Sequence, residues 1–179
     1  ELHDLGTRLA RRGQADEHEL TLHVIPSPKV HDFDDVDELL DLLDDLMADL
    51  KDVDYDVVGG LDAMGFVLGA AIAARSGVGF LPIRKAGKLC VDTDKVSFGN
   101  YSGRTQEMEM RKPAFGAGTR VLLVDQWVET GGTIDGAIRL VERQGGVVAG
   151  LLAIAIEENE RTDHYRQTYP CISAVVPGS

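Results

Sequence analysis

The sequence has few of the residues that mark an extracellular, membrane or nucleic-acid-binding protein. Two of its 179 residues are cysteine, too few for a disulfide framework or a cysteine zinc site, so we expect a reducing cytoplasm. No apolar run approaches a membrane span and no signal peptide is visible, so we expect no membrane partner. Six lysines face 30 Asp and Glu residues, and the net charge of −12 argues against a nucleic-acid partner.

The length and the apolar pattern predict one domain of the α/β class. We expect a single domain over residues 1–179, with an N-terminal segment 1–33 and a core 34–179. Apolar runs that end in Gly or polar residues predict five strands: Asp56–Gly60, Gly77–Ile83, Val121–Val124, Val147–Ile156 and Ile172–Val176. Helical spacing between these runs predicts a doubly wound parallel sheet of about five strands flanked by helices.

The N-terminal part of the chain predicts further elements before the first of these strands. A short helix is expected over Leu2–Arg12 and a strand over Glu19–Ile25. From Asp32 to Asp56 there are 12 carboxylates, and apolar residues recur between them at helical spacing. We interpret this stretch as a helix with a solvated acidic face, because carboxylates three or four residues apart make a poor metal cage.

The organising stretch is a buried strand followed by a glycine turn and a helix. Val121–Val124 ends at Asp125, the run Thr130-Gly131-Gly132-Thr133 follows, and Ile134–Arg143 has helical spacing. Free backbone N–H groups and the positive end of a helix dipole meet at such a turn, which makes it a phosphate site. A carboxylate a few residues upstream can hold sugar hydroxyls or a metal ion.

A second strand–glycine turn–helix unit is followed by a cluster of cations. Gly59 and Gly60 end a strand, and a slim alanine-rich helix runs from Gly65 to Arg75. The next strand ends at Ile83, and three basic residues come directly after it: Arg84, Lys85 and Lys88. The carboxyl edge of a parallel sheet is where open α/β folds bind ligands, so a second anion site is expected here.

The stretch between Leu89 and Gly118 predicts a hairpin that could act as a lid. Gly99–Arg104 reads as a mobile loop, and Gln106–Lys112 alternates like a half-exposed strand. Chemistry on a phosphorylated sugar benefits from a lid, because water must be kept away from the reacting atoms. A plain surface hairpin is the alternative.

These motifs together resemble the type I phosphoribosyltransferases, and adenine phosphoribosyltransferases in particular. The resemblance covers roughly Tyr55 to Ile156 and rests on Val58–Phe66, Gly77–Leu89 and the central stretch. It implies transfer of 5-phosphoribose from phosphoribosyl pyrophosphate to a purine base with release of pyrophosphate, with Mg²⁺ as cofactor. It also implies a homodimer, a small hood formed by the N- and C-terminal parts of the chain, and a flexible lid hairpin.

The resemblance also implies roles for individual residues. Pyrophosphate contacts are assigned to Asp62, Ala63, Arg84, Lys85 and Lys88. Ribose and 5-phosphate contacts are assigned to Asp125, Gln126, Thr130, Gly131, Gly132 and Thr133. Tyr101 in the lid is a further substrate contact, and Asp125 is expected to face the metal mostly through substrate.

Several positions depart from the adenine family's pattern. The family has an arginine where Met64 stands, and a second acidic residue where Gln126 stands. Its lid carries a glutamate, whereas residues 100–104 contain no carboxylate, and its N-terminal base-recognition motif is not found around Pro26–Asp34. Transfer chemistry is therefore better supported than the identity of the base.

Glu129 is the candidate for the missing proton acceptor. It stands just before Thr130, where 6-oxopurine phosphoribosyltransferases have an aspartate that acts as a base. We therefore place Glu129 with Asp125 as a catalytic candidate. The alternative is a carboxylate favoured only by the N-terminus of the following helix. For the whole protein, the alternatives are a 6-oxopurine enzyme and a non-catalytic sensor of phosphoribosyl pyrophosphate.

Overall fold

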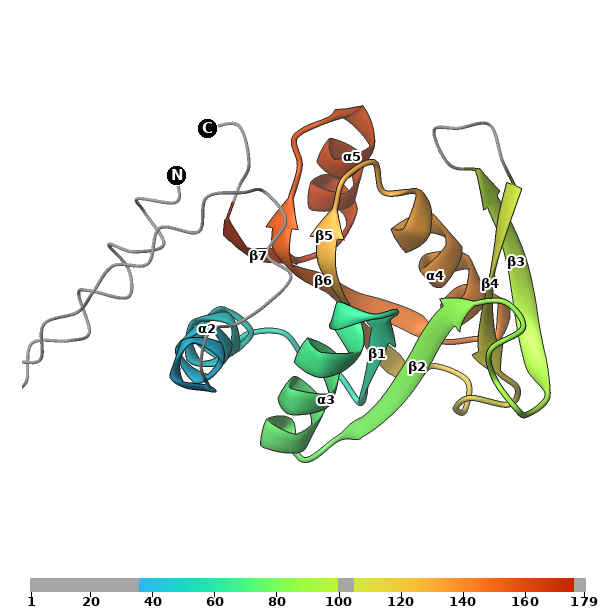
Figure 1. Ribbon diagram of the computed structural model, residues 1–179, viewed down its shortest axis with the longest axis horizontal. Helices are drawn as coiled ribbons and strands as arrows, with labels where there is room; N and C mark the ends of the chain where they lie inside the picture. Colours follow the sequence, from blue (N-terminus) through green and yellow to red (C-terminus); the bar gives the residue numbers. More distant parts are fainter. Residues whose placement is uncertain (1–35, 100–104, 176–179) are drawn as a thin grey trace, which may run out of the picture.

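The computed structural model describes residues 36–99 and 105–175, which form one seven-stranded sheet with helices on both faces (Figure 1). The strands are β1 (Val57–Leu61), β2 (Gly79–Lys85), β3 (Thr93–Gly99), β4 (Thr105–Arg111), β5 (Arg120–Val128), β6 (Val147–Ile156) and β7 (Cys171–Val175). The helices are α2 (Val36–Asp49), α3 (Met64–Ser76), α4 (Gly132–Arg143) and α5 (Glu160–Thr168). The strand order is β3-β4-β2-β1-β5-β6-β7.

The prediction of a doubly wound sheet with about five parallel strands is confirmed. Strands β2, β1, β5, β6 and β7 run parallel to one another. The predicted hairpin is also present as the antiparallel pair β3–β4. The sequence did not predict that β4 joins the main sheet antiparallel to β2, which extends the sheet by two strands.

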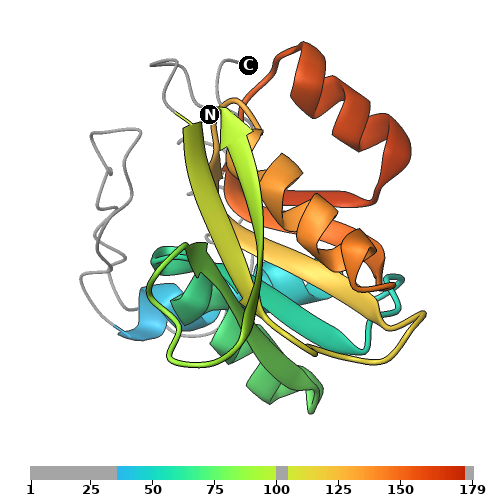
Figure 2. The ribbon, with the colours of Figure 1, turned by 90° about the vertical axis from the view of Figure 1, so that its right-hand side faces the viewer.

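The helices divide between the two faces of the sheet, and the change of side falls between β1 and β5. Side chains of α2 and α3 pack on one face in a core around Leu46, Leu68 and Leu122. Side chains of α4, α5 and the hairpin pack on the other face, in a core that includes Leu140 and Met108. Figure 2 shows the green and blue helices and the orange and red helices on opposite sides of the sheet. Because α3 leads away to β2 and α4 leads away to β6, β1 and β5 flank the topological switch point.

Two strands extend further than their sequences predicted. Pairing of β5 with β1 ends at Val124, but pairing with β6 continues to Val128 opposite Ile156. Asp125 therefore lies inside β5, at the point where the strand loses one neighbour. Similarly, β2 includes Arg84 and Lys85, because β4 pairs with both residues.

Helix α5 was not predicted, because its sequence carries no apolar stripe. Only Thr162 and Tyr165 are buried along it. Its start is fixed by Asn159, whose side chain accepts hydrogen bonds from the N–H groups of Arg161 and Thr162. Such a cap stabilises the start of a helix that buries few apolar side chains.

The predicted helix 2–12, strand 19–25 and N-terminal segment 1–33 lie outside the described residues. Within residues 36–99 and 105–175, no helix is both long and apolar enough to cross a membrane.

Candidate active site

The predicted site residues of β1, β2 and β5 meet at the carboxyl edge of the sheet. Leu61 lies opposite Ile83 and Gly60 lies opposite Val124, so Asp62, Arg84 and Asp125 follow at the same level. The turn after β1 packs closely on β5, because a Cβ on Gly65 would lie 2.5 Å from the Val124 carbonyl oxygen and 3.2 Å from the Asp125 Cα. Only glycine permits this approach, which brings the two predicted anion loops together.

Arg84 is held beside Asp62 at this edge. The Asp62 N–H donates to the Ile83 carbonyl at 3.2 Å, and the Asp62 carboxylate lies 3.8 Å from the Arg84 Nε. The guanidinium also lies over the Phe66 ring, 5.7 Å from its centre. Its Nε is buried and makes no hydrogen bond to the described residues. The next residue, Ala63, is exposed and follows Asp62 through a cis peptide bond.

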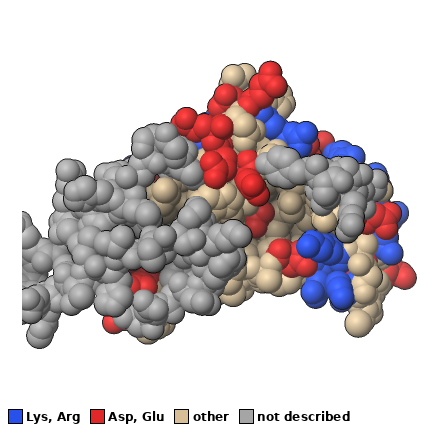
Figure 3. Space-filling view, turned by 45° about the horizontal axis from the view of Figure 1, so that its top comes forward, with Lys and Arg blue, Asp and Glu red and all other residues tan. Residues whose placement is uncertain are grey.

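Lys85, the last residue of β2, and Lys88, on the turn that follows β2, are both exposed. The backbone of this turn is held by β4, because the Lys88 and Leu89 N–H groups each donate to Glu109 Oε1 at 2.7 Å. Figure 3 shows a compact group of Lys and Arg side chains beside a hollow in the surface, with Asp and Glu side chains on its other side. A polyanion entering this edge therefore meets positive charge from one direction.

Asp125 is a carboxylate in a poorly hydrated position. Its Oδ1 accepts a hydrogen bond of 2.7 Å from the Gln126 N–H. The pKa of Asp125 is raised to about 7, mainly by burial and to a smaller extent by the negative charge of Asp62, against the lowering effect of that hydrogen bond. No group of three or more His, Cys, Asp or Glu side chains in the described part of the chain is arranged to hold a metal ion.

The predicted phosphate loop has the geometry that its sequence indicated. Gly131 precedes α4 in the left-handed conformation, with φ of 77°, and no side chain caps the helix. Gly132 and Thr133 form the start of α4, where N–H groups have no partner within the helix. Thr130 and Thr133 are half-buried beside them. Such N–H groups and the positive end of a helix dipole are the features with which proteins bind anions.

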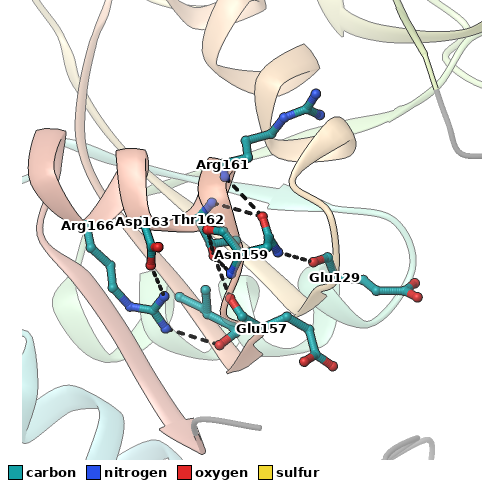
Figure 4. Close-up of polar contacts among 8 residues, drawn as sticks. Glu129, Glu157, Asn159, Arg161, Thr162, Asp163 and Arg166 are labelled. Atoms are coloured by element: carbon teal, nitrogen blue, oxygen red, sulfur yellow. Dashed lines mark hydrogen bonds and ion pairs between the residues drawn. The ribbon is translucent and has the colours of Figure 1, made fainter. Parts of the chain in front are cut away.

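Helix α5 braces this loop, which sequence reasoning missed. The Tyr165 hydroxyl lies 2.9 Å from the Gly131 carbonyl oxygen and 2.6 Å from Asp135 Oδ1. The Arg161 guanidinium lies 3.4 Å from the other oxygen of Asp135, and Asn159 donates to the Glu129 carbonyl at 2.8 Å (Figure 4). The spacing of Asn159 and Thr162 was the available signal, because it is a capping-box pattern.

The remaining predicted site residues are Glu129, Gln126 and Tyr101. The Glu129 side chain is exposed, and its carboxylate points away from α5 in Figure 4. Its backbone is anchored, whereas its side chain is open to solvent at the entrance of the phosphate loop. Gln126 is half-buried directly after Asp125. Tyr101 and the tip of the lid lie outside the described residues.

Comparison with known proteins identifies the family. The family model for the phosphoribosyl transferase domain matches residues 32–175. The adenine phosphoribosyltransferase of Clostridium perfringens is 44% identical over 126 residues, covering 70% of this chain and 72% of that protein.

Solved structures agree with this match. Adenine phosphoribosyltransferase from Thermoanaerobacter pseudethanolicus superposes with a TM-score of 0.74 at 32% identity, covering 79% of this chain and 82% of that one. The Saccharomyces cerevisiae enzyme, solved with adenine and an imino-altritol bisphosphate, gives a TM-score of 0.67 at 28% identity, covering 79% of this chain and 81% of that chain. The chain therefore belongs to the phosphoribosyltransferase family and is an enzyme of that family.

Proposed function

We propose that this protein transfers the 5-phosphoribosyl group of phosphoribosyl pyrophosphate to adenine, releasing pyrophosphate. The observation that carries the proposal is the convergence of Asp62, Arg84 and Asp125 beside an uncapped helix N-terminus. The relatives named above are adenine phosphoribosyltransferases, which favours adenine as the base.

The pyrophosphate is assigned to the β1 and β2 side of the edge. Arg84, Lys85 and Lys88 supply positive charge, and the Asp62–Ala63 turn supplies backbone contacts. When the bond at the anomeric carbon breaks, negative charge accumulates on the departing pyrophosphate. Fixed cations at that position stabilise the transition state more than the ground state.

The sugar phosphate is assigned to the β5 and α4 side. The N–H groups of Thr130, Gly131, Gly132 and Thr133 receive the 5-phosphate, while Asp125 and Gln126 receive the ribose hydroxyls. Gln126 forms these hydrogen bonds without the charge of a second carboxylate. Holding both ends of the substrate places the anomeric carbon between the two halves of the site. Tyr101 in the lid completes the substrate contacts.

The carboxylates present fit a Mg²⁺ ion that is carried by the substrate. The raised pKa of Asp125 reflects a buried carboxylate with a like charge nearby, an arrangement that a divalent cation relieves. Mg²⁺ commonly takes one or two protein carboxylates and fills its other positions with water and phosphate oxygens. When bound, it neutralises charge on the pyrophosphate.

Glu129 is proposed as the acceptor of the proton that the purine nitrogen loses. Its backbone is fixed by Asn159 and its carboxylate is free to face an incoming base. The alternative role is a carboxylate favoured only by the N-terminus of α4.

We propose that the active protein is a homodimer in the cytoplasm. Two alternatives remain. Glu129 favours an enzyme for 6-oxopurines, whereas Met64 and the lid sequence without a carboxylate favour a sensor that binds phosphoribosyl pyrophosphate without turnover.

A pyrophosphate-release assay tests the proposal. The protein is incubated with Mg²⁺ and phosphoribosyl pyrophosphate together with adenine, hypoxanthine, guanine or no base. Adenine should give the fastest release, and omission of Mg²⁺ should abolish it. Faster release with hypoxanthine or guanine would establish the 6-oxopurine alternative. Binding of phosphoribosyl pyrophosphate with no release for any base would establish the sensor.

A further inference from the structure

Glu109 is a buried carboxylate to which the site described above gives no role. It lies in β4 opposite Arg84 of β2 and is 1% exposed. The alternating sequence of β4 predicts a strand with Glu107 and Glu109 on its solvent face. Glu107 is exposed, in agreement with this pattern, whereas Glu109 is buried. A charged side chain is rarely buried unless its hydrogen bonds are made within the protein.

Both oxygens of Glu109 are used. Oε1 accepts the N–H groups of Lys88 and Leu89 at 2.7 Å each. Oε2 accepts the Thr93 hydroxyl at 3.2 Å and lies 4.0 Å from the Lys95 ammonium group. Although burial raises its pKa, backbone hydrogen bonds from Leu89, Lys88 and Gly87 outweigh that effect and lower the pKa overall. Glu109 is therefore ionised at neutral pH.

These contacts join two separate segments of the chain. Thr93 and Lys95 belong to β3 of the hairpin, whereas Lys88 and Leu89 belong to the turn that carries the exposed cations. The carboxylate binds the backbone of Lys88, and no ion pair with the Lys88 ammonium group is found in the described part of the chain. The turn is thereby held while its positive charge remains available to a ligand.

We propose that Glu109 is a positioning residue for the pyrophosphate end of the site, holding the turn Gly87–Leu89 in its ligand-binding conformation. The inference rests on the proposed function. A turn with exposed glycine and lysine residues has many conformations, and fixing one of them beforehand removes an entropic cost from ligand binding. Glu109 acts through Lys88 and does not itself touch the substrate.

Separate binding measurements for the two ends of the substrate test this role. Wild type, Glu109→Gln and the exposed control Glu107→Gln are titrated with Mg²⁺–pyrophosphate and with ribose 5-phosphate. Glu109→Gln loses the charge-assisted hydrogen bonds to the turn, so its affinity for Mg²⁺–pyrophosphate should be about tenfold weaker than that of the wild type. The affinity for ribose 5-phosphate should stay within about twofold of the wild type, because the loop 130–133 lies at the start of α4 and does not contact Glu109. Glu107→Gln should leave both affinities unchanged.

The possible outcomes separate this role from a purely structural one. Equal weakening of both ligands would overturn the proposal, since general loosening of the fold acts on both sites. Unchanged pyrophosphate affinity would also overturn it. If Glu109→Gln does not fold, Glu109→Asp decides by the same comparison, because it keeps the charge but falls short of the turn. Failure of the wild type to bind either ligand would instead reject the proposed function.

Discussion

Asp125 shows how the site's geometry controls the chemistry of one residue. In an ordinary environment its carboxyl group has a pKa of 3.8, whereas in the folded protein the pKa is raised to about 7, first by burial and then by Asp62. The folded protein therefore holds this proton more tightly than the unfolded chain does. It follows that stability from this group falls as the pH rises from about 4 to about 7.

We expect Asp125→Asn to remove this pH dependence in the ligand-free protein. The asparagine oxygen can still accept the Gln126 N–H, but the side chain cannot ionise. At pH 8 the variant should be more stable than the wild type, by on the order of 3 kcal/mol, and at pH 4 the two should be nearly equal. Denaturant unfolding at both pH values, without Mg²⁺, measures this difference. An equal difference at both pH values would contradict the raised pKa.

Replacing Glu129 should affect the rate of the reaction and not the stability of the fold. Because its carboxylate is exposed and only its carbonyl is tied to α5, Glu129→Gln should leave the fold intact. If Glu129 accepts the purine proton, turnover with the preferred base should fall by about 10²–10⁴-fold. Affinity for phosphoribosyl pyrophosphate should change little.

The control for this prediction is Glu158→Gln, which removes another exposed carboxylate shortly after β6. Its turnover should match the wild type. Unimpaired turnover in Glu129→Gln would leave Glu129 as a carboxylate at a helix N-terminus.

At the scale of elements, the phosphate loop depends on a helix with no apolar stripe. Only glycine fits at position 131, because α5 leaves no space for a side chain there. An added Cβ would lie 2.7 Å from the Tyr165 ring and 2.9 Å from the Arg161 Cδ. The loop therefore has its conformation fixed by α5 as well as by its own glycines.

Gly131→Ala should consequently damage both the loop and its ligand site. Its left-handed φ of 77° and the contact with Tyr165 both oppose a side chain. Gly118 has the same φ of 77° with nothing within 4 Å of an added Cβ, so Gly118→Ala isolates the backbone cost of about 1 kcal/mol. Gly131→Ala should lose about 1–3 kcal/mol more than that control.

Thermal unfolding and ribose 5-phosphate titration of both variants measure these effects. Binding should be lost in Gly131→Ala and kept in Gly118→Ala. Equal stability of the two variants would show that α5 does not press on the loop.

For the molecule as a whole, the sequence predicts those parts of the fold whose signal is local. The apolar runs of β1, β2, β5, β6 and β7 are each readable alone, and parallel order brings their carboxyl ends to one edge. The convergence of Asp62, Arg84 and Asp125 could therefore be predicted before the structure.

The parts that could not be predicted depend on contacts between segments distant in sequence. Glu109 is read from its strand as exposed, and it is buried only because the turn after β2 supplies N–H groups 20 and 21 residues away. Tyr165 lies 34 residues from the Gly131 carbonyl that it contacts. No periodicity records such pairings, and the polar sequence of α5 concealed the helix that makes them.

In the proposed function, the carboxyl edge of β1, β2 and β5 binds phosphoribosyl pyrophosphate, and a charge reversal at Arg84 tests this binding directly. Calorimetric titration of the Mg²⁺ complex of this substrate is compared for wild type, Arg84→Glu and Arg75→Glu. Both variants change the net charge equally, but Arg75 lies in the last turn of α3 beside Asp44, far along the helix from the Asp62 turn.

A negative charge at position 84 removes a charge-assisted contact worth about 1.5–3 kcal/mol and adds repulsion. Arg84→Glu should therefore weaken binding by about 100-fold or more, with Arg75→Glu within about twofold of the wild type. Tight binding by the wild type that Arg84→Glu leaves unchanged would contradict the account, because the pyrophosphate would then lie elsewhere.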